Sequence, residues 1–101
     1  MDDAKALAEA GAAFILIEMV PAKVAGEVTA ALTTAGTIGI GAGVDCSGQV
    51  LVLHDMLGVY PGKKPRFTKD FMVGASSIDD AVTRYVQDVK GKNFPAAEHS
   101  Y

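Results

Sequence analysis

The sequence predicts an α/β fold in which short parallel strands alternate with helices. Three observations support this prediction. A run of β-branched and aliphatic residues over 14–20 is too short for an independent helix, an amphipathic helical pattern follows it directly, and a second strand-like segment occupies 37–41. A strand, a helix and a strand within about thirty residues form a βαβ unit, whose crossover we expect to be right-handed.

Length and charge limit the classes of protein that this chain can represent. The 101 residues carry a net charge of -3 at pH 7, and 50% of them are hydrophobic. A chain of this length forms at most one domain with a modest core, which excludes a large multidomain enzyme. The charged residues, 21% of the chain, mix both signs, so we expect neither a disordered tail nor a nucleic-acid partner.

Cysteine content and hydropathy bear on localisation. Cys46 is the single cysteine, so no intrachain disulfide forms, and no Cys/His cluster has the spacing of zinc ligands. A reducing cytoplasm fits this composition, and we expect a cytoplasmic protein. No apolar run approaches the ~20 residues that span a bilayer, and Asp2 and Asp3 stand where a signal peptide would be basic. We therefore expect no membrane partner and no targeting segment.

The first half of the chain divides into a helix, a strand and a second helix. Residues 4–13 are rich in alanine and Gly11 interrupts them, which indicates the last part of a helix. Residues 14–20 are apolar on both alternating faces, as is typical of a parallel strand buried on both sides. Pro21 suits the first turn of the next helix, which we expect to end within 33–36. The predicted buried stripe of that helix follows the i, i+4, i+7, i+8 spacing and consists of Val24, Val28, Ala31 and Leu32.

The segment 49–57 has two possible interpretations. Its apolar start suits a strand. Ser47 is a good helix N-cap and Gly58 a good C′ residue, and a parallel strand would need a crossover longer than the predicted loop over 42–48. These features favour a short buried helix.

The last third of the chain contains the clearest helical pattern. Residues 66–69 have the composition of a short final strand. Ser77 and Asp80 then form a capping-box pattern, and Gly91 closes the helix. The tail over 92–101 shows no periodicity. The apolar face of this last helix consists of Ile78, Ala81, Val82, Tyr85, Val86 and Val89, and we expect it to dock on a neighbour.

These elements leave apolar surface without a cover. Parallel strands that are apolar on both faces need helices on both sides and neighbours along both edges. Two or three strands cannot supply these neighbours, and an open sheet of this size exposes backbone edges and invites association. The chain is therefore predicted to be part of a larger α/β assembly.

Glu18 is the residue that the sequence marks most clearly for chemistry. It is one carboxylate near the carboxyl end of an apolar strand, where parallel α/β folds gather functional groups. Burial at that position disfavours the charged form, which makes Glu18 a candidate general base. The alternative is a strand-end glutamate that pairs with a cation or reaches solvent.

The glycines over 39–43 also permit two interpretations. A dinucleotide-binding G-x-G-x-x-G pattern would need a third glycine where Val44 stands, and the acidic residue expected about twenty positions later is absent. A phosphate-binding loop would need a lysine that the segment lacks. Tight packing and a close turn at a strand end therefore explain the glycines better than a small nucleotide-binding module does.

The other polar candidates lack a complete constellation. His54 and Asp55 are adjacent, so on a helix they point about 100° apart and form no relay. We expect a buried, satisfied histidine and, at Cys46, an inert loop cysteine. His99, in the tail, either titrates near neutrality or is merely exposed. A basic cluster surrounds Pro65 and either meets an anionic ligand or lies in a solvated loop; it consists of Lys63, Lys64, Arg66 and Lys69.

Several segments, taken together, resemble one enzyme family. Residues 17–21 (IEMVP), 37–43 (TIGIGAG) and 48–58 (GQVLVLHDMLG) resemble the ketopantoate hydroxymethyltransferases. Residues 64–67 (KPRF) resemble the loop before that family's last helix, and 94–101 (FPAAEHSY) resemble the end of its chains. The resemblance covers nearly the whole chain, in order and with family spacing.

The resemblance implies a fold and a reaction. It implies the C-terminal part of a (β/α)8 TIM barrel of the phosphoenolpyruvate mutase type, about strands six to eight with their helices. Residues 1–101 would then be the C-terminal portion of one barrel domain, with no second domain. The implied reaction transfers a hydroxymethyl group from methylenetetrahydrofolate to 3-methyl-2-oxobutanoate and gives ketopantoate for pantothenate biosynthesis. Glu18 matches the family's proposed general base at the end of strand six, and the family forms homo-oligomers.

Length is the serious departure from the family. Its enzymes are well over twice as long, and the resemblance implies that the ligands of their Mg²⁺ and the residues that bind the keto acid lie in strands that precede this chain. We therefore assign no metal ligand here and expect the chain alone to be inactive. It is expected either to belong to a working transferase, completed by an N-terminal barrel portion, or to be a non-catalytic barrel fragment that associates with other copies of itself.

Overall fold

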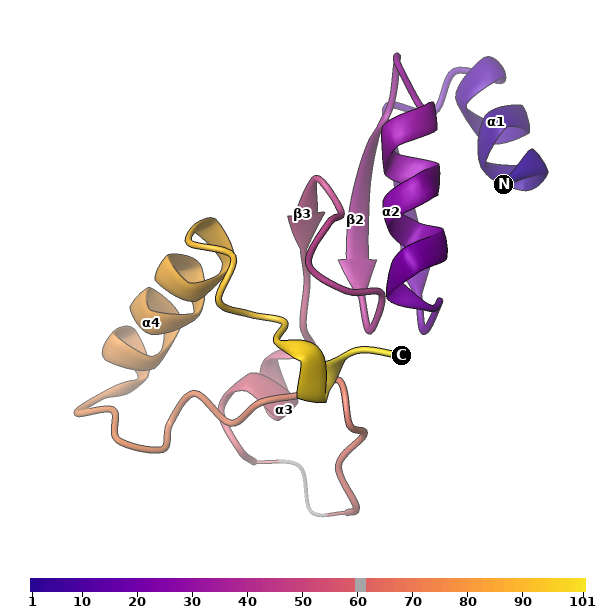
Figure 1. The fold of residues 1–101 in the computed structure, drawn as a ribbon. Coiled ribbons are helices and arrows are strands. Elements are labelled where there is room, and N and C mark those ends of the chain that lie inside the picture. Colours follow the sequence, from indigo (N-terminus) through magenta and orange to yellow (C-terminus); the bar gives the residue numbers. More distant parts are fainter. Residues whose placement is uncertain (60–61) are drawn as a thin grey trace.

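A computed structural model describes residues 1–59 and 62–101 as an elongated α/β unit with extents of 44 × 24 × 20 Å. Helices α1 and α4 lie at opposite ends of the molecule, on either side of the sheet (Figure 1). The elements in chain order are α1 (Asp2–Glu9), β1 (Phe14–Glu18), α2 (Ala22–Ala31), β2 (Gly36–Ile40), β3 (Gly48–Gln49), α3 (Leu53–Met56), α4 (Ile78–Lys90) and the short 3-10 helix η1 (Ala97–His99). In the part of the chain described, no helix is long and apolar enough to cross a membrane.

The sheet confirms the predicted parallel α/β class. Its strand order is β1-β2-β3, and both pairs of neighbours run parallel. Phe14 lies opposite Gly36 and Glu18 opposite Ile40, so β1 and β2 are in register over their full length. The two strands and α2 between them form the predicted βαβ unit, and both strands end at the same edge of the sheet.

The segment 49–57 combines the two interpretations that the sequence allowed. It begins with the end of β3 and continues into the four residues of α3. The objection that a parallel strand needs a longer crossover is wrong here, because β3 pairs only with the last part of β2: Gly48 lies opposite Ile38. The loop therefore returns by only about two residues, or ~7 Å along the strand direction.

The caps of α3 differ in part from the prediction. Val52 occupies the N-cap position, and Ser47 does not cap this helix. The Ser47 hydroxyl instead accepts a hydrogen bond from the Thr37 N–H at 3.0 Å. Gly58 follows the helix with a φ of +69°, as expected for a C′ residue.

β1 is buried on one face only, which corrects the expectation of a strand buried on both sides. Ile15 and Ile17 are buried, whereas Phe14 and Leu16 are 66% and 61% exposed. The buried side chains pack in a cluster with residues of α1 and α2, and these helices leave the other face open. The sheet thus has a helix-covered face and an uncovered face.

The buried face of α2 is also rotated from the predicted stripe. Ala25 and Val28 are buried and Leu32 is half-buried, but Val24 is 40% exposed and Ala31 is exposed. The helix therefore presents the i, i+3, i+7 row beginning at Ala25 to the sheet. Pro21 lies at the N-cap, one residue before the first helical turn.

Two hydrophobic clusters meet at the end of β2. The first lies between α1, α2 and the sheet and includes Ile17 and Ala42. The second lies around α3 and α4 and includes Ile40 and the ring of Phe67. Because Ile40 and Ala42 belong to different clusters, the end of β2 is the point at which the two halves of the molecule are joined.

The cap of α4 confirms the strongest local prediction. The Ser77 hydroxyl accepts a hydrogen bond from the Asp80 N–H at 3.0 Å. In a capping box the Asp80 carboxylate would accept a hydrogen bond from the Ser77 N–H. Here it accepts instead from the N–H of the preceding residue, Ser76, at 2.9 Å. This bond and the Arg84 guanidinium hold the pKa of Asp80 below its ordinary range. Gly91 ends the helix as predicted.

Only part of the predicted apolar face of α4 is covered. Ala81 is buried, and Tyr85 and Val89 are half-buried against the second cluster. The remaining side chains of that face are exposed: Ile78, Val82 and Val86. Residues 66–69 do not form the predicted strand. Residues 66 and 67 form a turn, which is closed by a hydrogen bond from the Thr68 N–H to the Pro65 carbonyl oxygen at 3.2 Å.

A buried hydroxyl network ties β2 to α2 and to the loop before β3. The Thr37 side chain is fully buried, and its Oγ1 lies 2.7 Å from the Thr29 Oγ1. The same Thr37 oxygen accepts a hydrogen bond from the Ser47 N–H at 3.0 Å. Burial raises the free-energy cost of leaving such polar groups unpaired, so this network fixes the position of β2.

We expect Thr37→Val to lower the free energy of unfolding by about 1–3 kcal/mol, because the shape is kept while the Ser47 N–H loses its acceptor. The Thr29 hydroxyl loses one of its two hydrogen bonds and keeps the one to the Ala25 carbonyl oxygen. Urea unfolding of the two proteins measures the difference. Thr83→Val, on the exposed side of α4, is the matched control and should change stability little. An equal effect of both substitutions would contradict a structural role for the network.

Tyr85 carries the second stability prediction of the fold. Its ring packs edge-on against Phe71 with centroids 5.3 Å apart, and its hydroxyl is buried without a hydrogen-bond partner among the residues that the structure describes. Burial raises the pKa of Tyr85. Tyr85→Phe should therefore keep or raise stability at pH 7, by up to about 2 kcal/mol.

The same substitution predicts a pH dependence. The pKa of Tyr85 is higher in the folded state than in the unfolded state, where it is about 10. The stability that this difference contributes is fully present below the unfolded-state pKa and is lost as pH rises through the folded-state pKa. Between roughly pH 9 and pH 11, the free energy of unfolding should fall more steeply with pH in the original chain than in Tyr85→Phe. Parallel slopes in unfolding titrations would refute this.

Candidate functional site

Glu18 lies at the carboxyl end of β1, on the uncovered face of the sheet. It follows Leu16 in the alternation of the strand and is exposed, whereas Ile17 points toward the helices. Its expected burial is therefore not observed, because the residues described leave this face open. The carboxylate is nevertheless the acidic group that the strand presents at its carboxyl end, opposite Ile40 of β2.

The turn after Glu18 is anchored on both sides. The Met19 N–H donates to the Ile40 carbonyl oxygen at 2.9 Å, which continues the β1–β2 pairing by one bond. Met19 has a φ of 51°, a left-handed conformation that costs a non-glycine residue about 1 kcal/mol or more. Two further residues, Val20 and Pro21, lead directly into α2. The connection from Glu18 to α2 is thus short, and the sheet holds its first residue.

The glycines after β2 serve close packing, as the structural interpretation predicted. Gly41 and Gly43 have φ values of +67° and +82°. A Cβ at Gly41 would lie 2.9 Å from the Phe67 ring, and one at Gly43 would collide with the Cβ of Ala22. The loop after β2 is therefore wedged between the start of α2 and Phe67, beside the end of β1.

The basic cluster around Pro65 does not converge on one point. Lys64 lies 3.9 Å from a carboxylate oxygen of Asp70, and Lys69 lies 3.5 Å from one of Asp88. The Arg66 Nη2 instead donates to the Ser100 carbonyl oxygen at 2.5 Å. Because the cations face separate partners, the arrangement does not support one anion-binding site.

The remaining candidates, His54, Cys46 and His99, have surroundings that differ from those of Glu18. His54 is exposed, which corrects the expectation of a buried histidine, and its neighbour Asp55 is buried. Cys46 is a buried free thiol beside Gly39. The His99 Nδ1 accepts a hydrogen bond from the Ala96 N–H at 3.1 Å, so this half-buried ring stabilises the turn of the tail.

Candidate metal ligands are not brought together among the residues that the structure describes. Within residues 1–59 and 62–101, no group of three or more His, Cys, Asp or Glu side chains is arranged to hold a metal ion. These residues therefore do not fit a magnesium site, and we assign none of them as a Mg²⁺ ligand.

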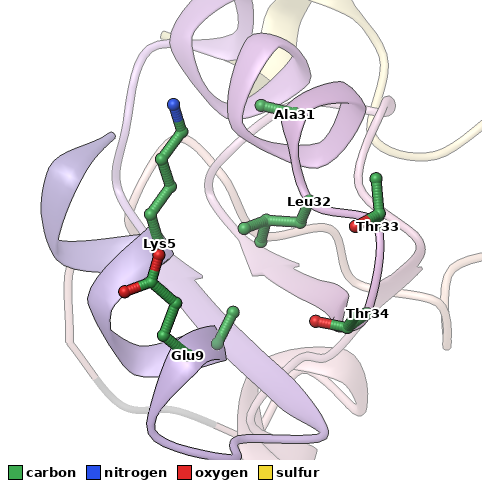
Figure 2. A pocket seen from close by; sticks show the side chains of 7 residues that line it. Lys5, Glu9, Ala31, Leu32, Thr33 and Thr34 are labelled. Carbon is green, nitrogen blue, oxygen red and sulfur yellow. The ribbon is translucent and has the colours of Figure 1, made fainter.

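Two hollows in the surface differ in their relation to Glu18. One, of about 330 Å³, runs along the outer edge of β1 and is lined by Glu18, Leu16, Leu7 and Val24 among others. The other, of about 550 Å³, lies between the last turns of α1 and α2, where Lys5 and Glu9 lie across from Leu32 and Thr34 (Figure 2). The second hollow borders the opposite end of the strands, so only the first belongs to the candidate site.

Comparison with known proteins identifies the family. The model of the ketopantoate hydroxymethyltransferase family matches residues 1–97. The chain belongs to the ketopantoate hydroxymethyltransferase family. The relative from Azoarcus sp. is 68% identical over 99 residues, which are 98% of this chain and 36% of the relative. The relatives from Aromatoleum aromaticum and Chromobacterium violaceum are 65% and 62% identical, over 98% and 100% of this chain and 36% and 38% of their own lengths.

All three relatives carry the name 3-methyl-2-oxobutanoate hydroxymethyltransferase. The chain spans about a third of their length. The resemblance predicted from short segments is thus confirmed over almost all of the chain. The family and these relatives carry the names of transferases.

One group of residues near the site was missed by sequence reasoning. The tail returns to the start of α2, where the Ala22 N–H donates to the Tyr101 main-chain oxygen at 3.1 Å. Arg66, interpreted from the sequence only as one cation of a cluster, stacks on the Tyr101 ring with 4.3 Å between Cζ and the centroid. No local pattern reveals a contact between residues this far apart in the sequence.

We expect Gly43→Ala to lower the free energy of unfolding by about 2 kcal/mol or more, because the left-handed backbone and the collision with Ala22 both oppose a side chain. Gly48→Ala is the matched control, since nothing lies within 4 Å of the added Cβ and its φ is not left-handed. Its expected cost is below about 1 kcal/mol. Chemical unfolding of both variants distinguishes them, and similar losses would exclude the proposed contact.

Proposed function

We propose that this chain forms the C-terminal portion, about strands six to eight, of the (β/α)8 barrel of a 3-methyl-2-oxobutanoate hydroxymethyltransferase and supplies its general base, Glu18. The observation that carries this proposal is the position of one carboxylate at the carboxyl end of β1, on the sheet face that the helices leave open. In barrels of this class, side chains at that end of a strand line the active site.

The uncovered surfaces of the chain agree with a portion of one barrel domain. β1 and β3 each have a neighbour on one side only in the sheet that the structure describes. Phe14 and Leu16 lie on the open face and would fill the interior of a closed barrel. An N-terminal barrel portion would pair with both free edges and cover these side chains.

Glu18 suits the first chemical step of the proposed reaction. The hydrogen on the carbon next to the keto group of 3-methyl-2-oxobutanoate is acidic because the resulting enolate is delocalised. A carboxylate in contact with that hydrogen accepts it and leaves a nucleophilic carbon. That carbon then forms a bond to the methylene carbon of methylenetetrahydrofolate, and the two bonds from this methylene carbon to the folate nitrogens break. Water supplies the hydroxyl oxygen of the new hydroxymethyl group. Tetrahydrofolate leaves with one proton from the keto acid and one from that water on its nitrogens. Closure of the barrel would cover Glu18, which is exposed in this chain.

The proposed cofactor and partners follow from the same assignment. Mg²⁺, when bound, supplies electrostatic stabilisation of the enolate, and its ligands belong to the portion of the enzyme that this chain does not span. The keto acid, the folate and the N-terminal barrel portion are the proposed partners, in a cytoplasmic homo-oligomer.

A second, non-catalytic possibility rests on the exposed apolar surface. The open face of β1 and the exposed side of α4, with Ile78, Val82 and Val86, would drive the isolated chain to associate with copies of itself. Sedimentation at low concentration measures this directly. A compact monomer of 10.5 kDa would exclude self-association.

A chimera tests the proposed function. The Azoarcus relative, with its matching segment replaced by this chain, should transfer the hydroxymethyl group, because the identity is 68% over that segment. Glu18→Gln in the chimera should lower kcat by about 10²–10⁴-fold, since the amide cannot accept the proton. It should equally slow exchange of the hydrogen next to the keto group in D₂O, which is measured by NMR without folate.

Glu27→Gln is the matched control, because Glu27 is an exposed carboxylate on α2, away from the carboxyl end of β1. It should leave both rates unchanged. A chimera that folds and stays inactive would contradict the assignment of the chain to this enzyme. A Glu18→Gln chimera with full proton exchange would instead remove Glu18 as the base and leave the rest of the proposal intact.

A further inference from the structure

The last residues of the chain lie across the carboxyl edge of the sheet, although they follow α4 at the far end of the molecule. Figure 1 shows the tail passing from α4 through η1 to the start of α2. Within the tail, the Ser100 hydroxyl donates to the Ala96 carbonyl oxygen at 2.9 Å, and the His99 Nδ1 accepts from the Ala96 N–H. These bonds make residues 96–100 a compact turn that presents Tyr101 to α2.

Arg66 fixes this turn through two different contacts. Its guanidinium donates to the Ser100 carbonyl oxygen, and the same group stacks on the Tyr101 ring. A charged donor makes a stronger hydrogen bond than a neutral one, and a planar guanidinium can stack while it donates in its own plane. Both contacts are therefore made by one side chain, and a lysine could not reproduce them together.

The tail also provides a hydrogen-bond partner for the first N–H group of α2. The first N–H groups of a helix have no partner within the helix, and the Ala22 N–H finds one in the Tyr101 main-chain oxygen. Pro21, at the N-cap, has no side-chain oxygen with which to cap the helix. The tail thus replaces the cap that the local sequence does not provide.

The capped residue is separated from Glu18 by three residues, 19–21. One end of this connection is held by the bond from Met19 to Ile40, and the other by the bond from Ala22 to Tyr101. The left-handed Met19 persists because both ends are held, since a strained conformation relaxes when its surroundings no longer require it. Loss of the second bond would free the turn that directs the Glu18 carboxylate.

We propose that Arg66 is a positioning residue for Glu18: it holds Ser100 and Tyr101 against the start of α2 and thereby fixes the turn between the carboxylate and that helix. The inference rests on the proposed role of Glu18 as the base. Arg66 touches neither substrate nor reacting atoms in this scheme. It acts on the rate of proton removal through the geometry of residues 19–21.

The test uses the active chimera and two readouts. Arg66→Gln should raise amide hydrogen exchange in the peptide that spans residues 19–22 by on the order of tenfold, because the cap of Ala22 is loosened. It should lower kcat by about tenfold through misalignment of the base, while KM for 3-methyl-2-oxobutanoate stays within about twofold. A general loss of folding would instead raise exchange throughout the sheet, including β2.

Two further variants separate the contacts. Arg66→Lys keeps the charge but not the planar stack, and should recover part of kcat. Tyr101→Leu removes the ring but keeps the main-chain oxygen, and should loosen residues 19–22 less than Arg66→Gln does. Lys63→Gln, an exposed cation in the same loop, is the control and should change neither readout.

The two proposals fail in different ways. Unchanged exchange at residues 19–22 in Arg66→Gln would overturn the positioning role while Glu18 remained the base. Faster exchange with unchanged kcat would overturn it as well, because the turn would then not govern the reaction. A fully active Glu18→Gln chimera would overturn the positioning role through loss of the base itself.

Discussion

The parallel pairing of β1 with β2 constrains every feature near the candidate site. Because Glu18 lies opposite Ile40, the strands end level and the loops that follow them begin side by side. One loop enters α2 after three residues, and the other lies against the start of that helix through Gly43. A slip of β1 by one residue would turn Glu18 toward the helices and Ile17 to the open face. The register therefore determines which side of the sheet can carry chemistry.

The parts of the fold that the sequence predicts are those with local signals. Ser77 and Gly91 bound α4, and the apolar run before Glu18 identifies β1, because capping and short-range hydropathy depend only on neighbouring residues. β3 was harder to predict because its ladder has two residues and no periodicity of its own. Burial of both faces of β1 was predicted wrongly, since a hydropathy pattern records what a strand can bury and not what is present to cover it.

The same distinction applies to the candidate site: local sequence identifies some of its residues and not others. Glu18 stands out in the sequence because a single carboxylate interrupts an apolar strand, and the glycines after β2 stand out as requirements of close packing. Arg66 and Tyr101 do not, because their contact joins segments separated by a helix and its flanking loops. The residues that hold a functional group in place are in this way harder to recognise than the group itself.

The open face of β1 makes the stability of the chain a property of its surroundings. A segment that covers Phe14 and Leu16 binds the folded state and not the unfolded one, so in thermodynamic terms it acts as a ligand. At a free concentration 100 times its dissociation constant, such a ligand adds about 2.7 kcal/mol to the free energy of unfolding. The melting temperature of this chain therefore shifts with the concentration of whatever covers β1, and it has a defined value only when that concentration is stated.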